Sequence, residues 1–149
     1  DSINGLSIGE YGEVGLCARE AGVPCIFGGG EEAFTKEAEA LTPGMVTVSV
    51  KQGLFPDGLD HLSAEEYRVA KLAALHLSPA EACRRLRAGA AAAARKRRDQ
   101  PGSFRYPEIK PPYVRIVKFR AEGGRPPHTG RAEHPSSIAA LLNQPLVAV

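Results

Sequence analysis

Residues 23–50, VPCIFGGGEEAFTKEAEALTPGMVTVSV, determine the fold class of this chain. Residues 23–27 form an apolar run that predicts a short buried strand, bounded by three glycines. Residues 31–41 predict a helix, and residues 45–50 alternate and are β-branched, which predicts a second strand. A strand, a helix and a strand in this order are typical of an α/β domain with at least partly parallel strands.

The residues before this stretch extend the same alternation of strands and helices. Asn4 and Gly5 predict a tight turn between two short strands in residues 1–8, because Asn-Gly accepts the positive φ angles that such a turn needs. Residues 9–21 predict a helix. We therefore expect a layered α/β/α fold with a mixed, partly parallel sheet, formed by residues 1–149 as a single domain.

The second half of the chain contains two helix-start motifs. Ser63 and Ser78 each stand three residues before a glutamate, which is the capping-box pattern, and Pro79 suits the first helical position. The helix that follows Ser78 is expected to reach Arg98. The predicted order ends with a strand over 113–119, a Gly/Pro-rich loop over 121–133, a short helix over 136–142 and a strand over 146–149.

The composition is that of an ordinary globular domain. The 149 residues are 43% hydrophobic and 24% charged, and no apolar run approaches the roughly 20 residues of a membrane span. We therefore expect a cytoplasmic protein with no membrane partner. The three cysteines form no CxxC pair, so a zinc ribbon is not expected and free thiols are.

The charge is divided unevenly along the chain. Residues 1–66 carry a net charge of −9, and residues 67–149 carry a net charge of +11. Seven basic side chains lie in residues 84–98, a stripe that would suit nucleic acid. Cations also favour the C-terminal end of a helix, and no aromatic residues are interleaved for stacking bases. We therefore interpret the stripe as structural and do not expect nucleic acid as a partner.

No single motif of the chain specifies a site by its sequence alone. The glycines at 28–30 precede a helix, but two glutamates follow where a phosphate would sit, so no nucleotide site is expected. The histidines lack metal-ligand spacing, and we interpret them as solvated or structurally bonded, with His61 in a loop and His76 at a helix end. The remaining signal is GEYG at residues 9–12, which puts a glutamate in the first turn of a predicted helix.

Several short segments, none of them specific alone, follow one another in an informative order. They are Asn4-Gly5, Glu10-Tyr11-Gly12, Gly22-Val23-Pro24, Gly30-Glu31-Glu32, residues 36–39, Pro43-Gly44, Val50-Lys51 and residues 77–82. Together they resemble the zinc-dependent D-aminopeptidase family that is linked to dipeptide-transport operons. The resemblance covers residues 1–98 and fades in residues 99–149.

The resemblance implies a two-zinc centre, a ring-like homo-oligomer and hydrolysis of short peptides, including D-amino-acid peptides, at a free amino end. The glutamate of the family's Gly-Glu-x-Gly motif is a zinc ligand and maps onto Glu10, whose carboxylate is a suitable anionic donor. The family's other ligands and its proposed catalytic histidine lie upstream of the position that matches Asp1. We therefore expect this chain to be the C-terminal part of a longer protein or to meet a companion N-terminal chain, and no catalytic residue is assigned.

Val14 stands where family members often have an asparagine. Residues 55–71 look like an insertion, which leaves the substrate preference open. Lys51, at the end of the predicted central strand, is a candidate for substrate or subunit contact, since ligands bind at strand ends in α/β sheets. Its alternative role is a solvated strand terminus.

The alternative function of the chain is a non-catalytic α/β assembly or binding module that has lost the metal site. A third hypothesis is nucleic-acid binding through residues 84–98.

Overall fold

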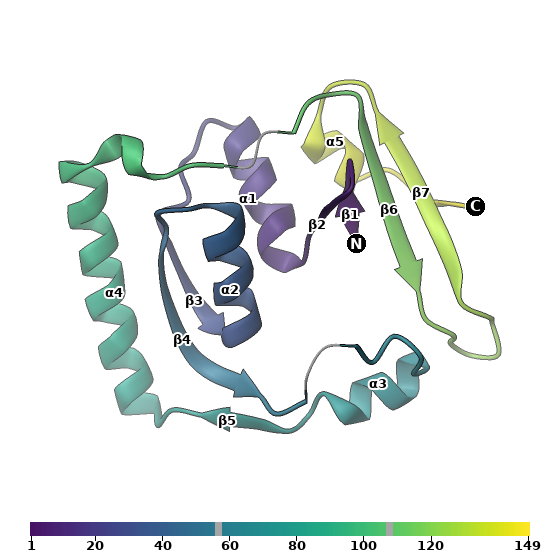
Figure 1. Ribbon diagram of the computed structural model, residues 1–149, viewed down its shortest axis with the longest axis horizontal. Helices are drawn as coiled ribbons and strands as arrows, with labels where there is room; N and C mark the ends of the chain where they lie inside the picture. Colours follow the sequence, from purple (N-terminus) through teal and green to yellow (C-terminus); the bar gives the residue numbers. More distant parts are fainter. Residues whose placement is uncertain (56–57, 107–108) are drawn as a thin grey trace. The chain divides into compact units, whose positions relative to one another are not determined.

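The computed structural model describes residues 1–55, 58–106 and 109–149 (Figure 1). It contains helices and two sheets, which confirms the predicted α/β class. The chain groups into two compact units, which we call the five-stranded unit and the three-stranded unit. The first comprises Asp1–Ile8, Gly53–Ala74 and Ile109–Val149, and the second comprises Gly9–Gln52 and Leu75–Glu108. The single domain expected over residues 1–149 stays a prediction.

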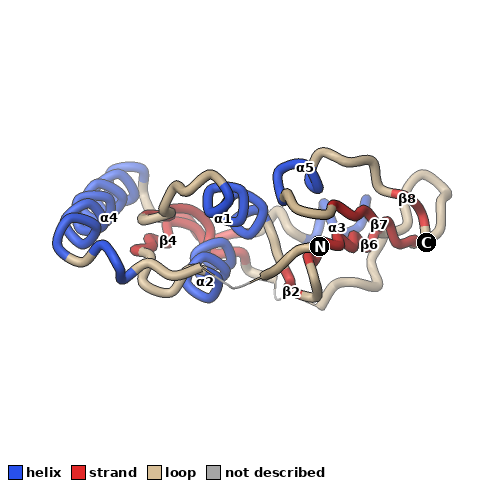
Figure 2. Tube along the Cα trace, turned by 90° about the horizontal axis from the view of Figure 1, so that it is seen from above, coloured by secondary structure: helices blue, strands red, loops and turns tan. Residues whose placement is uncertain are grey.

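The three-stranded unit is a short sheet with helices on both faces (Figures 1 and 2). Its elements are α1 (Glu10–Glu20), β3 (Phe27–Glu31), α2 (Glu32–Leu41), β4 (Val46–Gly53), β5 (Ala74–His76), α4 (Pro79–Asp99) and a 3₁₀ turn (Pro101–Ser103). The strand order is β3-β4-β5, and β3 pairs with β4 in parallel, as the strand–helix–strand pattern predicts. Helix α4 lies on one face of the sheet, and α1 and α2 lie on the other.

The prediction of a strand over 23–27 is wrong, because β3 begins at Phe27 and contains the three glycines that were expected to bound it. The reason is the close cover on both faces of the sheet. A Cβ added at Gly29 would lie 2.3 Å from Leu86 of α4, and one at Gly28 would lie 3.1 Å from Phe34 of α2. Only residues without side chains allow both helices to approach this strand so closely.

The five-stranded unit is an antiparallel sheet in the order β2-β1-β6-β7-β8. Its elements are β1 (Ser2–Ile3), β2 (Leu6–Ser7), α3 (Ala64–Ala70), β6 (Tyr113–Phe119), β7 (His128–His134), α5 (Ile138–Leu142) and β8 (Val147–Ala148). The predicted turn between β1 and β2 is confirmed, with φ of 50° at Asn4 and 80° at Gly5. The core of the unit lies between the sheet and α5, where Ile3, Ile138 and Leu141 are buried.

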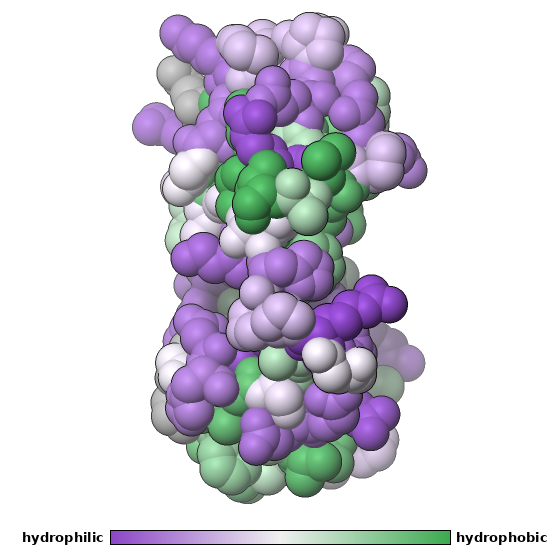
Figure 3. Space-filling model, turned by 90° about the vertical axis from the view of Figure 1, so that its right-hand side faces the viewer, coloured by the Kyte–Doolittle hydropathy of each residue, from purple (hydrophilic) through white to green (hydrophobic). Residues whose placement is uncertain are grey.

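Apolar side chains also remain on the surface of this unit. Phe119, Val147 and Val149 are exposed, and Figure 3 shows apolar side chains gathered on the side where the chain ends.

The capping box at Ser63 is confirmed, because its hydroxyl accepts the backbone N–H of Glu66 and the Glu66 carboxylate accepts the backbone N–H of Ser63. Positions 56 and 57 of the insertion expected over 55–71 lie outside the described residues.

Three sequence assignments need correction in the second half of the chain. The loop expected over 121–133 contains strand β7, whose buried residues are the small Gly130 and Ala132. Its period-two pattern is hidden because the inward positions are small and the outward ones polar. His76 lies in strand β5 and not at a helix end. The last helix and strand are shorter than predicted, spanning Ile138–Leu142 and Val147–Ala148.

Candidate functional site

Glu10 is the first residue of helix α1 in the three-stranded unit, and its side chain is exposed. No hydrogen bond or ion pair joins its carboxylate to any of the residues that the structure describes. Glu10 lines a cavity of about 490 Å³ that is walled mainly by apolar side chains. The other lining residues are Tyr11, Val14, Pro24, Cys25, Ile26, Phe27, Phe34 and Met45. Glu10 is therefore a charged group available at the edge of an apolar hollow.

Glu37 of helix α2 caps the start of helix α1. Its Oε1 accepts the backbone N–H of Gly9 at 2.5 Å and the backbone N–H of Gly12 at 3.0 Å. Gly9 is the N-cap residue and Gly12 is three positions further on, the two amides that a capping box satisfies with two side chains. Because glycine has no side chain, the cap has to come from another element. Glu37 therefore caps the start of α1, and the Glu10 side chain takes no part in capping.

Tyr11 forms a rigid wall of the cavity next to Glu10. Its hydroxyl is hydrogen-bonded to the Thr42 hydroxyl at 2.5 Å, and its ring meets Phe34 edge-on with centroids 5.8 Å apart. Burial raises the pKa of Tyr11 well above its ordinary value, so the phenol stays protonated. A neutral, buried and hydrogen-bonded phenol is a packing group, and we assign it no proton transfer.

Tyr106 holds the loop that leads into β3, and residues of that loop, Pro24, Cys25 and Ile26, form another part of the cavity wall. Its hydroxyl accepts the backbone N–H of Cys25 and donates to the carbonyl of Val23 at 2.8 Å. All three cysteines, Cys17, Cys25 and Cys83, are free thiols, as the sequence predicts. Burial raises the pKa of Cys17, so this thiol is less easily ionised than an exposed one.

The described residues fit only part of a metal centre. Among residues 1–55, 58–106 and 109–149, no three His, Cys, Asp or Glu side chains come together to hold an ion. Zinc sites take at least three protein ligands, so Glu10 cannot hold zinc alone. Its exposed, unpartnered carboxylate has the chemistry of one such ligand. The zinc ligation expected of Glu10 stays a prediction.

Lys51 does not share the cavity of Glu10, whose lining residues do not include it. The strand end expected at Lys51 is wrong, because β4 continues to Gly53. Lys51 is exposed and lies opposite Glu31 in the register of β3 and β4, so β4 is the central strand as predicted. Its expected contact with a substrate or a subunit stays a prediction.

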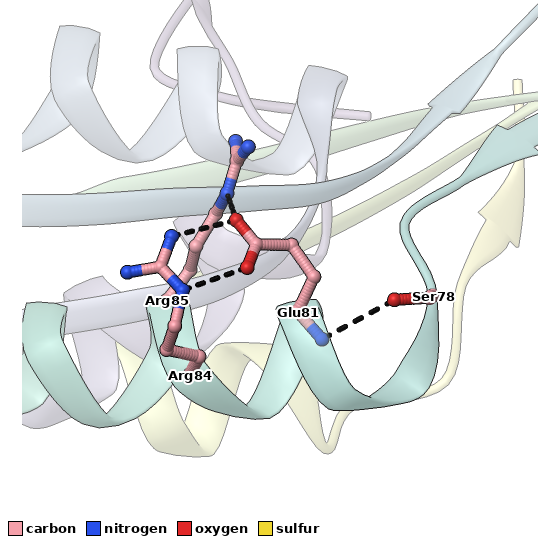
Figure 4. A network of polar contacts seen from close by, with 4 residues as sticks. All are labelled: Ser78, Glu81, Arg84 and Arg85. Carbon is pink, nitrogen blue, oxygen red and sulfur yellow. Dashed lines mark hydrogen bonds and ion pairs between the residues drawn. The ribbon is translucent and has the colours of Figure 1, made fainter.

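The basic stripe of residues 84–98 is largely engaged within helix α4 and the residues that follow it. The Glu81 carboxylate binds both Arg84 and Arg85, each at 2.7 Å, while the Ser78 hydroxyl accepts the backbone N–H of Glu81 at 3.3 Å (Figure 4). These two guanidinium groups lower the pKa of Glu81 to about 2. Further along the helix, Arg98 pairs with Asp99 at 2.7 Å.

The other end of this stripe serves packing within the same unit. Lys96 Nζ donates to the carbonyl of Gly44 at 2.5 Å and lies 5.4 Å from the ring centre of Phe104. Arg97 donates to the carbonyl of Pro101 at 3.1 Å. These contacts give part of the stripe a structural role, and the expectation that nucleic acid is not a partner stays a prediction.

The family model described as D-aminopeptidase matches residues 2–124. This match covers well over half of the chain. The chain belongs to the D-aminopeptidase family. No curated protein and no solved structure matches it. Membership in this family supports a peptidase function, and it confirms the family part of the resemblance found in the sequence.

The D-aminopeptidase segments of the sequence acquire a spatial explanation in the three-stranded unit. The segment at residues 36–39 contains Glu37, which contacts the GEYG segment through its two glycine amides. This role was not anticipated from the sequence. A signal was available, because Glu37 falls three residues after Phe34 and four before Leu41, on the inward side of α2.

Every helix among the described residues is too short or too polar to traverse a bilayer.

Proposed function

We propose that this chain contributes Glu10 to the dinuclear zinc site of an aminopeptidase that hydrolyses short peptides, including peptides of D-amino acids. The remaining zinc ligands come from residues outside this chain. One observation carries the proposal: Glu10 is exposed and lines a cavity, and none of the described residues engages its carboxylate, while Glu37 caps the helix. The family match over residues 2–124 supports the peptidase class.

Zinc, when bound, supplies Lewis acidity to polarise a peptide carbonyl and to acidify water. The contribution of this chain is the Glu10 carboxylate and the cavity wall beside it. The wall places apolar side chains beside Glu10, and apolar surroundings strengthen the attraction of a carboxylate for a cation. We further propose a cytoplasmic homo-oligomer, completed by the N-terminal part of the same protein or by a companion N-terminal chain.

The test compares Glu10→Ala and Glu10→Gln with the parent protein in the assembly that holds the site. We expect both variants to lose zinc and peptidase activity on short peptides, because neither offers a carboxylate. Glu20→Gln, at the other end of α1, is the matched control and keeps both. Unchanged zinc content and unchanged activity in the two Glu10 variants would overturn the proposal.

The second candidate is a non-catalytic α/β assembly or binding module. It is favoured by the lack of a complete ligand group among the described residues. Metal analysis and the solution mass of the native protein separate the two candidates. A stable oligomer without zinc would favour the module, and a zinc-loaded one would favour the peptidase.

A further inference from the structure

We infer that Glu37 is the positioning residue for Glu10: it fixes the first turn of α1 and thereby the direction of the Glu10 carboxylate. The inference rests on the proposed function, because it assigns Glu37 a part in the same zinc site. It extends that function to a residue that contacts neither the metal nor the substrate. Three features of the molecule support it: the contacts of Glu37, the glycines around Glu10 and the freedom of the Glu10 side chain.

The contacts of Glu37 hold both ends of the segment that contains Glu10. A single oxygen, Oε1, accepts the amides of Gly9 at 2.5 Å and Gly12 at 3.0 Å. These residues are the N-cap and third positions of α1, and Glu10 is the first helical residue between them. The direction in which a side chain leaves a helix follows from its backbone. Fixing the two flanking amides therefore fixes the direction of Glu10.

The glycine at position 9 makes this contact possible. A Cβ at Gly9 would lie 2.8 Å from Oε2 of Glu37 and 3.3 Å from its carboxyl carbon. A larger residue would push the carboxylate away from both amides. The first glycine of the GEYG segment is thus explained by the approach of Glu37.

Within the part of the chain that the structure describes, no hydrogen bond or ion pair orients the Glu10 carboxylate directly. The neighbouring Tyr11 is fixed by Thr42 and Phe34, which secures the other side of this helical turn. Helices α1 and α2 therefore meet at Glu37 and at Tyr11, with Glu10 next to both contacts in sequence. Outer contacts that orient a metal ligand typically change metal affinity by about 10- to 100-fold when they are removed.

The experiment uses three variants and two readouts. Glu37→Ala removes the acceptor, and Glu37→Gln keeps an oxygen that can accept both amides. Glu32→Ala removes a half-buried carboxylate of the same helix as a control. The first readout is the hydrogen exchange of the Gly9 and Gly12 amides in this chain. The second is the zinc affinity of the assembled protein, measured against a competing chelator.

We expect Glu37→Ala to lose protection at both amides and to lower zinc affinity by about tenfold. Glu37→Gln and Glu32→Ala keep both properties near those of the parent. Zinc affinity unchanged in Glu37→Ala, with amide protection lost, would overturn the inference and leave Glu37 a structural cap. If Glu10→Ala itself retains zinc, the proposed function fails, and this result is distinct from failure of the inference alone.

A second variant covers the case in which Glu37→Ala does not fold. Gly9→Ala keeps the carboxylate but displaces it from the amides, because the added Cβ meets Oε2. We expect the same loss of amide protection and a similar loss of zinc affinity. Zinc affinity equal to the parent's in Gly9→Ala, with the amides unprotected, would contradict the positioning role.

Discussion

The Oε1 atom of Glu37 accepts the backbone N–H of Gly9 at 2.5 Å, so helix α2 supplies the cap that helix α1 lacks. A charged acceptor makes such a bond shorter and stronger than one between neutral groups. Two segments that are 28 residues apart along the chain are joined by this contact. The start of α1 therefore depends on tertiary structure, and not on local sequence alone.

Replacing Glu37 by Ala should lower the free energy of unfolding by about 1–2 kcal/mol, the range measured for lost helix caps and charged hydrogen bonds. Glu37→Gln should recover most of this loss because its amide oxygen is also an acceptor. Urea denaturation measures both effects. Glu32→Ala, which removes a partly exposed ion pair with Lys36, should change the value by less than about 0.5 kcal/mol. Equal losses in Glu37→Ala and Glu32→Ala would contradict the capping role.

Gly44→Ala should destabilise the protein by about 3 kcal/mol or more, from strain at positive φ together with overpacking. Gly44 has a φ of 98°, and an added Cβ would lie 1.9 Å from the carbonyl oxygen of Ser103. Gly102→Ala is the matched control, since its Cβ would meet no atom within 4 Å. Thermal unfolding of the two variants makes the comparison. A melting temperature for Gly44→Ala close to that of Gly102→Ala would refute the close approach.

The ion pairs of Glu81 should stabilise α4 in a pH-dependent manner. Arg84 and Arg85 lower the pKa of Glu81 from 4.5 to about 2 in the folded state. The folded protein thus binds this proton less readily than the unfolded chain, so the stabilisation is complete above pH 4.5 and is lost as the pH falls towards 2. The difference in stability between the parent and Glu81→Gln should therefore shrink over this range. A difference that stays constant from pH 6 to pH 2 would exclude the ionic contribution.

Arg120 should fix the loop before helix α3 in the five-stranded unit. Its guanidinium donates to the carbonyls of Leu59 and Leu62 and lies 4.0 Å from the ring centre of Tyr67. Arg120→Ala should make residues 58–63 about tenfold more susceptible to limited proteolysis, since local opening sets the rate of cleavage. Lys118→Ala, an exposed cation on β6, is the control. Identical cleavage rates for the two variants would show that Arg120 does not hold the loop.

Much of the fold follows from local signals in the sequence. The Asn4-Gly5 turn, the capping box at Ser63 and the alternation over Tyr113–Phe119 each encode their structure within a few residues. Strand β3 could not be placed in this way, because its glycines have low strand propensity and are selected by helices on both faces of the sheet. Strand β7 was missed because its buried positions are Gly130 and Ala132, which carry little hydrophobic signal.

The candidate site was only partly predictable. GEYG located Glu10, and the order of the segments located the family, which the match over residues 2–124 confirms. The spacing of Glu37 indicates only that it lies on the inward side of α2; its role as a cap was not predictable, since its partners are backbone amides of another helix. Lys51 was assigned to a strand end because the alternation fades there, whereas β4 extends two residues further, to Gly53.

The division of labour between Glu10 and Glu37 has an evolutionary consequence. Because the cap belongs to Glu37, a change at Glu10 leaves the first turn of α1 intact, and selection for folding does not protect the residue proposed to bind zinc. A single substitution at position 10 could thus abolish the proposed zinc binding during evolution. The resulting protein would still fold and could take on another function. The converse does not hold, since drift at position 37 would endanger folding and chemistry together.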